Sequence, residues 1–295
     1  MKNFPTDVAI SWETPSAFND PKIKKNVKLK LCEMQVCHLS DKEMVAAAEN
    51  LDYMCTLSQW HRKFIVHSGL RMPFEKVIVF PNGIRLERYK KSDFEAKIDK
   101  KIKNNPKFVY SSSPDRGLWY LLQMWPYIRE EFPKAELSVC YGLEDWVNAV
   151  KWSHGRIAEM ALGIIELLNQ PGIKNLGKIG QDQLAKLQME ADAWLYPFDP
   201  MSPTESGCIS AIENAAAGNP IITTDADCME LEFGKFGYIV KLPFYPKEFA
   251  EKTIEILHDT DYMKHMRIEG RKFAEKRDWN LIANQWLEFF KEEVK

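Results

Sequence analysis

Two glutamates eight positions apart stand in a segment whose residue types suit binding of a polar ligand. Glu205 and Glu213 belong to PTESGCISAIENAAAGNPIITTD, residues 203–225. The small and apolar residues around Glu213 predict a helix, and the β-branched residues that follow predict a strand. Carboxylates accept strong hydrogen bonds from hydroxyl groups. A plainer interpretation also stands, in which Glu205 offsets the helix dipole and Glu213 faces solvent.

The expected start of that helix offers donors that complement the two carboxylates. The backbone N–H groups of Gly207, Cys208 and Ile209 fall at its first turn. They have no partner within a helix, and they lie at the positive end of its dipole, so they favour an anion. A ligand with hydroxyl groups at both ends and a diphosphate between them, as in a nucleotide-sugar, fits this layout.

Two further strand-to-helix junctions carry small and polar residues. They are SSSPDRG, residues 111–117, and KIGQDQ, residues 178–183. Ligands of parallel α/β sheets bind where strands end and helices begin. We therefore expect both junctions to lie on the same rim as residues 203–208.

An alternation of strands and helices predicts the elements that position these junctions. Short apolar runs such as KVIVF, KFVYSS and DAWLYPF alternate with helical segments such as SDKEMVAAAENL, in which Ser40 and Glu43 match a capping box. This order predicts βαβ units with parallel sheets. Residues 85–106 lose the pattern and are highly charged, as a linker would be. The predicted fold is α/β, with two Rossmann-like domains facing each other across a cleft.

Other segments are predicted in less detail. The strand DVAIS is followed by a basic, irregular stretch, PKIKKNVKLK, which either is a solvated arm, steers an anionic acceptor or rests on a membrane surface. A long helix is expected near residues 153–170, and residues 261–295 are expected to be helical throughout.

Composition restricts the class of protein. The 295 residues, 45% of them hydrophobic, suffice for two compact domains or one large one, and the net charge of −2 argues against a nucleic-acid partner. The six cysteines show no CxxC pair and mostly adjoin apolar residues, which predicts buried free thiols in a reducing compartment. No apolar run has the length of a signal peptide core or a bilayer span. We expect a cytoplasmic protein without a transmembrane segment.

Three separated motifs resemble one known family. The two glutamates followed by NAAAGNPIITTD resemble the signature of retaining GT-B glycosyltransferases of the family 4 (glycosyl transferases group 1) type. FVYSSSPDRGLWYLLQMWPYIREEFPKAELSVCYG resembles the opening of that family's donor domain, and LSQWHRKFI with EKVIVFPNGI resembles the end of its first domain. RDWNLIANQWLEFF resembles the family's closing helices, one of which returns to the first domain.

The resemblance implies a role for each candidate residue. Glu213 would hold the ribose hydroxyls of the nucleotide, Glu205 would contact the transferred sugar, and Arg116 would pair with the departing diphosphate. For Arg116, a surface arginine after a turn is the alternative. The other implied donor-binding residues are Ser112, Ser113, Lys178, Ile179, Gly180, Gly207, Cys208 and Ile209.

The resemblance also implies the reaction. The family transfers a sugar from a nucleotide-diphospho-sugar, here with UDP or GDP as the expected carrier, to an acceptor hydroxyl. It retains the anomeric configuration and needs neither a metal nor another cofactor. The acceptor is expected to be a glycan, or a lipid-linked or protein-linked group, and peripheral contact with a membrane stays open. The DAD at 225–227 is interpreted as a loop rather than a metal motif.

The sequence departs from the family at three places. A second basic residue that the family often has near the phosphate loop is not obvious, and Lys178 is only a possible substitute. Gly207 stands where the family often has an aromatic residue. The first domain is abbreviated, and His38 is the best candidate for its catalytic histidine, although a capping or packing role is the simpler interpretation. His61 and His67 are expected to be structural, and Trp60, Trp119 and Trp125 to lie in the core. The expected division is 1–90, 91–275 and a returning helix at 276–295.

Two other functions remain open on the sequence. The chain could be a nucleotide-sugar epimerase or phosphorylase on a GT-B-like scaffold. Alternatively, the short first domain could leave a non-catalytic protein that binds nucleotide-sugars or serves as a scaffold. Release of a nucleoside diphosphate from UDP- or GDP-sugars discriminates among the three.

Overall fold

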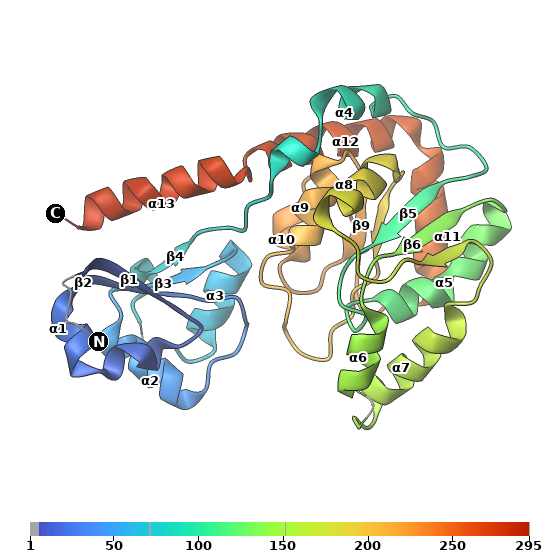
Figure 1. Ribbon diagram of the computed structural model, residues 1–295. Coiled ribbons are helices and arrows are strands. Elements are labelled where there is room, and N and C mark those ends of the chain that lie inside the picture. Colours follow the sequence, from blue (N-terminus) through green and yellow to red (C-terminus); the bar gives the residue numbers. More distant parts are fainter. Residues whose placement is uncertain (1–5, 71, 151, 295) are drawn as a thin grey trace. The chain divides into compact units, whose positions relative to one another are not determined.

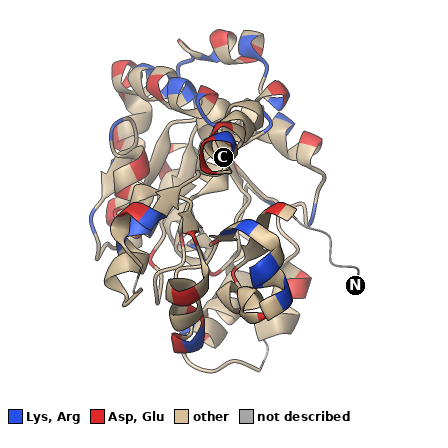
Figure 2. Cartoon of the chain, turned by 90° about the vertical axis from the view of Figure 1, so that its left-hand side faces the viewer, with Lys and Arg blue, Asp and Glu red and all other residues tan. Residues whose placement is uncertain are grey.

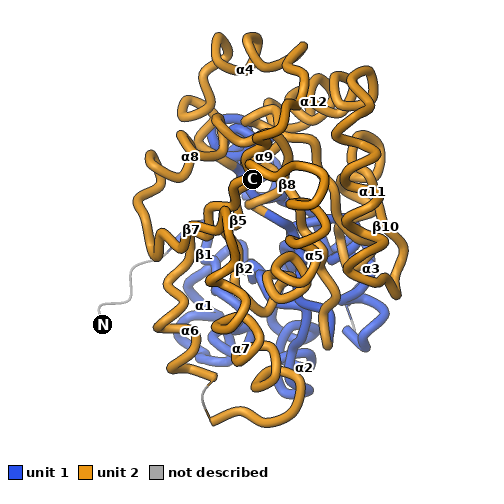
Figure 3. Tube along the Cα trace, turned by 90° about the vertical axis from the view of Figure 1, so that its right-hand side faces the viewer, with its two compact units in different colours: residues 1–83, 202–208, 277–295 blue, residues 84–201, 209–276 orange. Residues whose placement is uncertain are grey.

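The computed structural model describes residues 6–70, 72–150 and 152–294 (Figure 1). The chain divides into two compact units (Figure 3). The first unit combines Met1–Gly83, Ser202–Cys208 and Arg277–Lys295, and the second combines Ile84–Met201 and Ile209–Lys276. Both units contain parallel sheets with helices between the strands, so the predicted α/β class is confirmed.

The first unit is built on a four-stranded parallel sheet in the order β1-β2-β3-β4. Its strands are β1 (Thr6–Trp12), β2 (Val27–Glu33), β3 (Tyr53–Thr56) and β4 (Val77–Val79). Its helices are α1 (Pro21–Asn26), α2 (Asp41–Asn50), α3 (Gln59–His67) and α13 (Trp279–Glu293), with short 3-10 turns at Pro15–Asn19 and Phe74–Lys76. Ser40 caps α2 and Ser58 caps α3, each by accepting a backbone N–H, as the sequence predicts.

The basic stretch after β1 is folded, so its interpretation as an irregular arm is wrong. Residues 21–26 form α1, and β2 follows immediately. In β2 the residues Leu29 and Leu31 are buried and alternate with lysines, which is the period-two pattern of a strand. Lys30 reaches Asp52 at 3.0 Å instead of extending into solvent alone.

Helices cover both faces of this sheet. One cluster joins Cys32 and Met54 to Ala47 of α2 and Ile65 of α3. In a second cluster, aromatic residues of α13 pack against the strands. The Trp286 ring stacks on the Phe80 ring at a centroid distance of 3.9 Å. The last helix of the chain therefore completes the core of the first unit.

The second unit contains two three-stranded parallel sheets, β5-β6-β7 and β10-β9-β8. Its strands are β5 (Lys107–Tyr110), β6 (Glu136–Val139), β7 (Ile173–Asn175), β8 (Trp194–Tyr196), β9 (Ile221–Thr224) and β10 (Tyr238–Val240). A parallel bridge between Phe108 and Ala193 joins β5 to the start of β8. The strand order across the unit is therefore β7-β6-β5-β8-β9-β10.

Helices connect these strands. They are α4 (Lys91–Lys97), α5 (Leu118–Glu131), α6 (Leu143–Val150), α7 (Arg156–Leu167), α8 (Gln181–Glu190), α9 (Ile209–Ala216), α10 (Met229–Phe233), α11 (Pro246–His258) and α12 (Thr260–Glu275). A 3-10 turn precedes α4 at Leu86–Arg88. α5 packs against α11 and α9 packs against α12 (Figure 1).

Three expectations about helices need correction. The segment 85–106 is not a structureless linker, because α4 forms within it and buries Phe94 and Lys97 in the second unit. The helix expected near 153–170 is shorter, and α6 precedes it. The segment expected to be one continuous helix forms two, α12 and α13, and Asp278 caps the start of the second.

The core of the second unit is aromatic around its central strand. Trp194 and Tyr196 of β8 are fully buried, and their rings stack at 4.6 Å. All three residues of β8 are buried, so both faces of this central strand are covered, which explains its continuous apolar sequence. Trp125 is fully buried as predicted, whereas Trp60 and Trp119 are only half-buried.

Charge and cysteine placement agree with the composition. Acidic and basic residues are mixed along the helices of both units (Figure 2). All six cysteines are free and buried, as expected. Within the described chain, no helix combines the length and apolar character needed to cross a bilayer.

Candidate functional site

The strand order of the second unit indicates where a ligand binds. From the centre the chain runs outward twice, from β5 to β7 and from β8 to β10. In such sheets the connections after the two central strands diverge, and ligands bind in the crevice that opens outside their carboxyl ends. The loop after β5, residues 111–117, and the beginning of the loop after β8 therefore form the candidate site.

The loop after β5 is held in shape by its own hydrogen bonds. The carbonyl oxygen of Ser113 accepts the Tyr110 hydroxyl at 2.7 Å and the backbone N–H of Arg116 at 2.9 Å. The Ser113 hydroxyl donates to the carboxylate of Asp115. The side chains of Ser112, Ser113 and Arg116 are half-buried. Arg116 thus stands in a closed turn at the carboxyl end of a central strand.

A glycine brings this loop close to the end of β8. Gly117 has a φ of 104°, and a Cβ placed on it would lie 2.8 Å from the carbonyl oxygen of Pro197. A larger residue would be strained by the backbone angle and would also collide with that carbonyl. The two loops of the candidate site are therefore in direct backbone contact.

The start of α9 adjoins the same loop. The hydroxyl oxygens of Ser111 and Ser210 are 3.0 Å apart and share a hydrogen bond. Asn214, one turn later, donates to the carbonyl of Ser210 at 2.8 Å. Within the second unit, the structure therefore places the junction at residues 111–117 beside the first turn of α9.

Glu213 is not a solvent-facing helix residue, so that alternative is wrong. It is half-buried, and burial raises the pKa of its carboxyl group, while the Gln188 amide and the Arg88 guanidinium lower it. Its Oε2 accepts a hydrogen bond from Gln188 Nε2 at 3.3 Å. A partly buried carboxyl group with a shifted pKa is a candidate for a functional site.

The third junction lies at the amino end of α8. Gly180 is its N-cap residue, and Ile179 packs against a cluster that includes Val109 and Leu184. Lys178 is exposed and adjoins Gly142, in the loop after β6. These residues follow β7, whose carboxyl end lies on the same sheet edge as that of β5.

Glu205 belongs to a segment that docks on the first unit. Residues 202–208 group with that unit, whereas Glu213 and Arg116 belong to the second. Glu205 is buried, with 6% of its surface exposed. The predicted convergence of Glu205 with Arg116 and Glu213 stays a prediction.

Residues 202–208 contact the loops that leave the carboxyl ends of three strands in the first unit. The Ser58 hydroxyl, after β3, donates to the carbonyl of Ser206 at 2.7 Å, and the Ser206 hydroxyl donates to the carbonyl of Gln35, after β2, at 2.7 Å. Asn82, after β4, donates to the carbonyl of Gly207 at 2.8 Å. The edge where parallel sheets bind ligands thus holds the segment that contains Glu205.

The same contacts explain the departure at Gly207. A Cβ on this residue would lie 2.8 Å from the Cβ of Leu57 and 3.4 Å from Asn82 Nδ2. Any side chain there would have to push the segment away from the sheet. The glycine therefore serves close docking of residues 202–208 on the first unit.

The histidines differ in their surroundings. His61 is fully buried and links two backbone groups: its Nδ1 accepts from Leu57 N–H at 3.3 Å, and its Nε2 lies 3.0 Å from the carbonyl of Val36. His67 is exposed and bonds its own helix. His38 is exposed, packs edge-on against Phe64, and lines a cavity of about 140 Å³ with Cys37 and Met44. Its catalytic role stays a prediction.

A buried lysine, Lys97, contacts the carboxyl ends of the two helices that carry Gln188 and Glu213. Lys97 Nζ donates to the carbonyls of Gln188 at 3.5 Å, Met189 at 3.4 Å and Ala217 at 3.1 Å, and to the side chain of Asn219. These oxygens lie at the carboxyl ends of α8 and α9, where the helix dipole favours a cation. Lys97 therefore ties together the two helices that carry Gln188 and Glu213.

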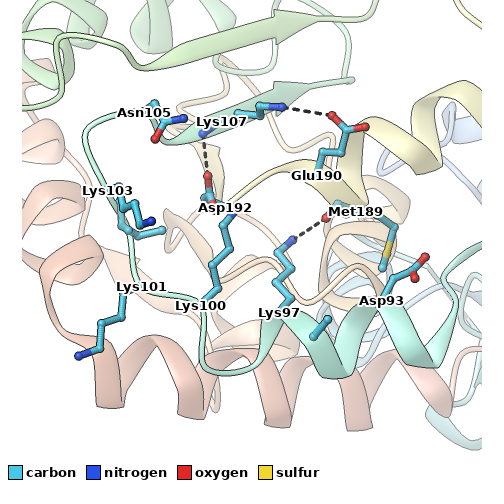
Figure 4. Close-up of a pocket in the computed structure, with 12 residues that line it drawn as sticks. Asp93, Lys97, Lys100, Lys101, Lys103, Asn105, Lys107, Met189, Glu190 and Asp192 are labelled. Carbon is cyan, nitrogen blue, oxygen red and sulfur yellow. Dashed lines mark hydrogen bonds and ion pairs between the residues drawn. The ribbon is translucent and has the colours of Figure 1, made fainter.

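Lys97 also borders a cavity of about 600 Å³ (Figure 4). Its wall is rich in lysines, but Lys100 pairs with Asp192 at 2.5 Å and Lys107 pairs with Glu190 at 3.3 Å. The cavity lies at the amino end of β5, whereas the candidate site lies at the carboxyl end. We therefore do not assign it to the same ligand.

Residues 225–227 form the turn after β9, in agreement with their interpretation as a loop. The carboxylate of Asp225 accepts the backbone N–H of Leu242 at 2.9 Å and lies 3.5 Å from Lys241. Among the described residues, no group of three or more His, Cys, Asp or Glu side chains is arranged to hold a metal ion. Metal independence stays a prediction.

Sequence reasoning missed the partners of the predicted residues. Gln188 is fully buried and shares a helix face with Leu184 and Ala185. A glutamine at three- and four-residue spacing from apolar residues signals a buried amide that needs partners. Ser111 begins one predicted junction and Ser210 lies two residues beyond another, but no local pattern indicates that they meet.

The order of the strands and the two adjoining loops define the second unit as a doubly wound α/β unit of the kind that binds nucleotides at its switch point. The family model described as glycosyl transferases group 1 matches residues 90–273, more than half of the chain. The chain belongs to this family. A search of curated protein sequences finds no match.

Several solved structures share the fold. HepE of Anabaena in complex with UDP-glucose is similar with a TM-score of 0.70 and 19% identity, over 97% of this chain and 79% of that one. A glycosyltransferase of Rickettsia africae gives 0.75 and 16%, over 98% and 77%. Sucrose-phosphate synthase of Thermosynechococcus elongatus gives 0.74 and 17%, over 98% and 73%. The GT-B fold predicted from the sequence is confirmed.

Proposed function

We propose that this chain transfers a sugar from a nucleotide-diphospho-sugar to an acceptor hydroxyl with retention of the anomeric configuration, and that it does so without a metal or another cofactor. UDP or GDP is the expected carrier. Membership of the glycosyl transferases group 1 family supports transfer of a sugar. The complex of the Anabaena protein with UDP-glucose supports a nucleotide-sugar donor.

The observation that carries the proposal is the meeting of two loops at the switch point. The loop with Arg116 adjoins the start of α9 through Ser111 and Ser210, and α9 carries the partly buried Glu213. A guanidinium, backbone donors and a carboxylate at one sheet edge match a diphosphate with a ribose attached.

Each residue has a distinct proposed role. Glu213 accepts hydrogen bonds from the ribose hydroxyls, and Glu205 accepts from hydroxyls of the transferred sugar. Arg116 stabilises the negative charge that grows on the departing diphosphate. The remaining donor contacts are proposed for Ser112, Ser113, Lys178, Ile179, Gly180, Gly207, Cys208 and Ile209. His38 is proposed to face the acceptor.

The proposed step breaks one bond and forms one. The bond between the anomeric carbon and the phosphate oxygen breaks, and the acceptor oxygen bonds to that carbon on the same face. The proton of the acceptor hydroxyl passes to the departing phosphate oxygen. Charge develops on the diphosphate, so a cation held there accelerates the step more than it strengthens ground-state binding.

The test is release of a nucleoside diphosphate from UDP-, GDP- and ADP-sugars, with the anomeric configuration of the product read by NMR and the assay repeated with a chelator. Glu205→Ala and Arg116→Ala should each lower turnover about a hundredfold or more, as loss of a transition-state contact does. Glu49→Ala is the control, because Glu49 is an exposed acid on α2.

Three results would contradict the proposal in different ways. Binding without turnover that is unchanged by Glu205→Ala favours an inert nucleotide-sugar binding or scaffolding protein. Release of a free epimer favours an epimerase. An inverted product, or activity lost on chelation and restored by a metal, refutes the proposed mechanism while leaving sugar transfer in place.

A further inference from the structure

A buried chain of hydrogen bonds leads from the region after the 3-10 turn to Glu213. The Tyr89 hydroxyl donates to Gln188 Oε1 at 2.7 Å, and Gln188 Nε2 donates to Glu213 Oε2 at 3.3 Å. Tyr89 is 3% exposed and Gln188 is fully buried. Water therefore does not replace either partner, and the amide must take both of its hydrogen bonds from the protein.

The main-chain atoms of Tyr89 and Gln188 are held by contacts that do not involve the side chains of these two residues. The carbonyl of Gln188 accepts from Asn219 Nδ2 at 2.9 Å as well as from Lys97. Arg271 of α12 donates to the carbonyl of Tyr89 at 2.9 Å and to that of Ala216, at the end of α9, at 2.7 Å. Substitutions in the Tyr89 and Gln188 side chains therefore leave these main-chain anchors in place.

The tyrosine determines which way the amide points. Burial raises the pKa of Tyr89, so its hydroxyl stays protonated and donates a hydrogen bond. When the amide oxygen accepts this hydrogen bond, the NH₂ group of Gln188 is turned toward Glu213. The reverse orientation would set the amide oxygen against a carboxylate, where two acceptors repel.

We propose that Gln188, oriented by Tyr89, is a positioning residue that holds the Glu213 carboxylate in the orientation in which it binds the vicinal hydroxyls of a nucleotide ribose. The inference rests on the proposed function. Gln188 does not touch the ligand in this scheme. It restricts rotation of the Glu213 side chain, so that this side chain loses its conformational entropy on folding and not on ligand binding.

The charged surroundings give Gln188 a second effect on Glu213. Burial raises the pKa of Glu213, and the amide of Gln188 and the guanidinium of Arg88 lower it. Arg88 is itself paired with Asp182 at 2.9 Å, and Arg271 bonds carbonyl oxygens rather than Glu213. Loss of Gln188 therefore raises the pKa of Glu213 further. As the pH is lowered, the variant should lose the ionised carboxylate, and with it nucleotide binding, at a higher pH than the wild type does.

The test compares two ligands and a double variant. Tyr89→Phe/Gln188→Met replaces both partners of a buried hydrogen bond with apolar groups of similar size, which is milder for folding than removing one. The ligands are UDP, or GDP where the wild type prefers it, and the same nucleotide without its 2′ and 3′ hydroxyls. Calorimetry at several pH values gives the affinities.

The double variant should bind the intact nucleotide about tenfold more weakly, the usual effect of losing a hydrogen bond to a charged group. Its affinity for the dideoxy nucleotide should be unchanged, and the pH below which the intact nucleotide fails to bind should rise. Gln170→Met is the matched control, because the Gln170 amide bonds only the carbonyls of Leu122 and Leu167 among the contacts described for it.

The inference would be overturned if the double variant lost affinity equally for both ligands or for neither. This conclusion requires that Glu213→Gln folds normally and binds the intact nucleotide more weakly than the wild type does. A wild type that binds no nucleoside diphosphate, or a Glu213→Gln variant that binds as the wild type does, would refute the proposed function and the inference with it. If the double variant does not fold, Tyr89→Phe alone should give the same ligand-dependent loss at about threefold.

Discussion

Replacing Lys97 by methionine should loosen the second unit at the two helices that carry Gln188 and Glu213. The substitution keeps the aliphatic stem and removes the ammonium group. It leaves the carbonyls of Gln188, Met189 and Ala217 without that donor. Buried acceptors that lose a charged donor destabilise a protein strongly.

The size of the effect follows from two opposing contributions. Hydrogen bonds from a charged donor are worth roughly 1.5–3 kcal/mol each, so four acceptors set a high upper limit. Burial lowers the pKa of Lys97, because removing an ammonium from water costs several kcal/mol. We expect a net loss of about 3 kcal/mol in the free energy of unfolding, or about 6–12 °C in Tm for a unit of this size.

Two measurements check this expectation. Urea denaturation gives the free energy of unfolding, and hydrogen exchange read by mass spectrometry should show amides of α8 and α9 exchanging about a hundredfold faster. Lys101→Met is the control, since Lys101 is an exposed lysine of the same segment, and it should change stability by less than about 0.5 kcal/mol. Equal midpoints and equal protection in the two variants would refute the role given to Lys97.

Three further outcomes are expected. Burial lowers the pKa of His61 to about 4, so the unfolded chain binds the proton first. The contribution of His61 to the free energy of unfolding should be complete above about pH 6.5 and fall by about 1.4 kcal/mol per pH unit between pH 6.5 and 4. Urea midpoints should fall less steeply with decreasing pH in His61→Gln, and equal pH dependence in the two proteins would contradict this. Gly207→Ala should cost about 1–3 kcal/mol, because its Cβ meets Leu57 at 2.8 Å, and should lower turnover; wild-type values for both would exclude close docking. Gly117→Ala should weaken nucleotide binding, because its φ and the Pro197 carbonyl exclude a side chain; unchanged calorimetric affinity would count against the loop contact.

Features that depend on neighbouring residues could be read from the sequence. The helix at 41–50 and its Ser40 cap, the strands around DAWLYPF and the burial of the free cysteines all follow from patterns within about fifteen residues. The three junctions were located the same way, since each follows a strand pattern and precedes a helix pattern. The missed strand β2 shows the limit: its period-two alternation was present but was masked by its lysines.

Features that join distant parts of the chain could not be read in this way. The Glu43 carboxylate, expected to return to its own cap, instead accepts hydrogen bonds from Ser16. Tyr89 and Gln188 are 99 residues apart, and Ser58 and Ser206 are 148 apart. Each of these partners is one of many polar residues, and nothing local distinguishes it.

Local patterns thus specify which segments become strands and helices, because propensity, capping and hydrophobic period act over a few turns. The strand order, the close approach at Gly207 and the burial of Lys97 and Gln188 arise only when the sheets assemble. Their energies come from excluding water and from mutual steric fit between segments far apart in the chain, so they have no counterpart in any short stretch of sequence.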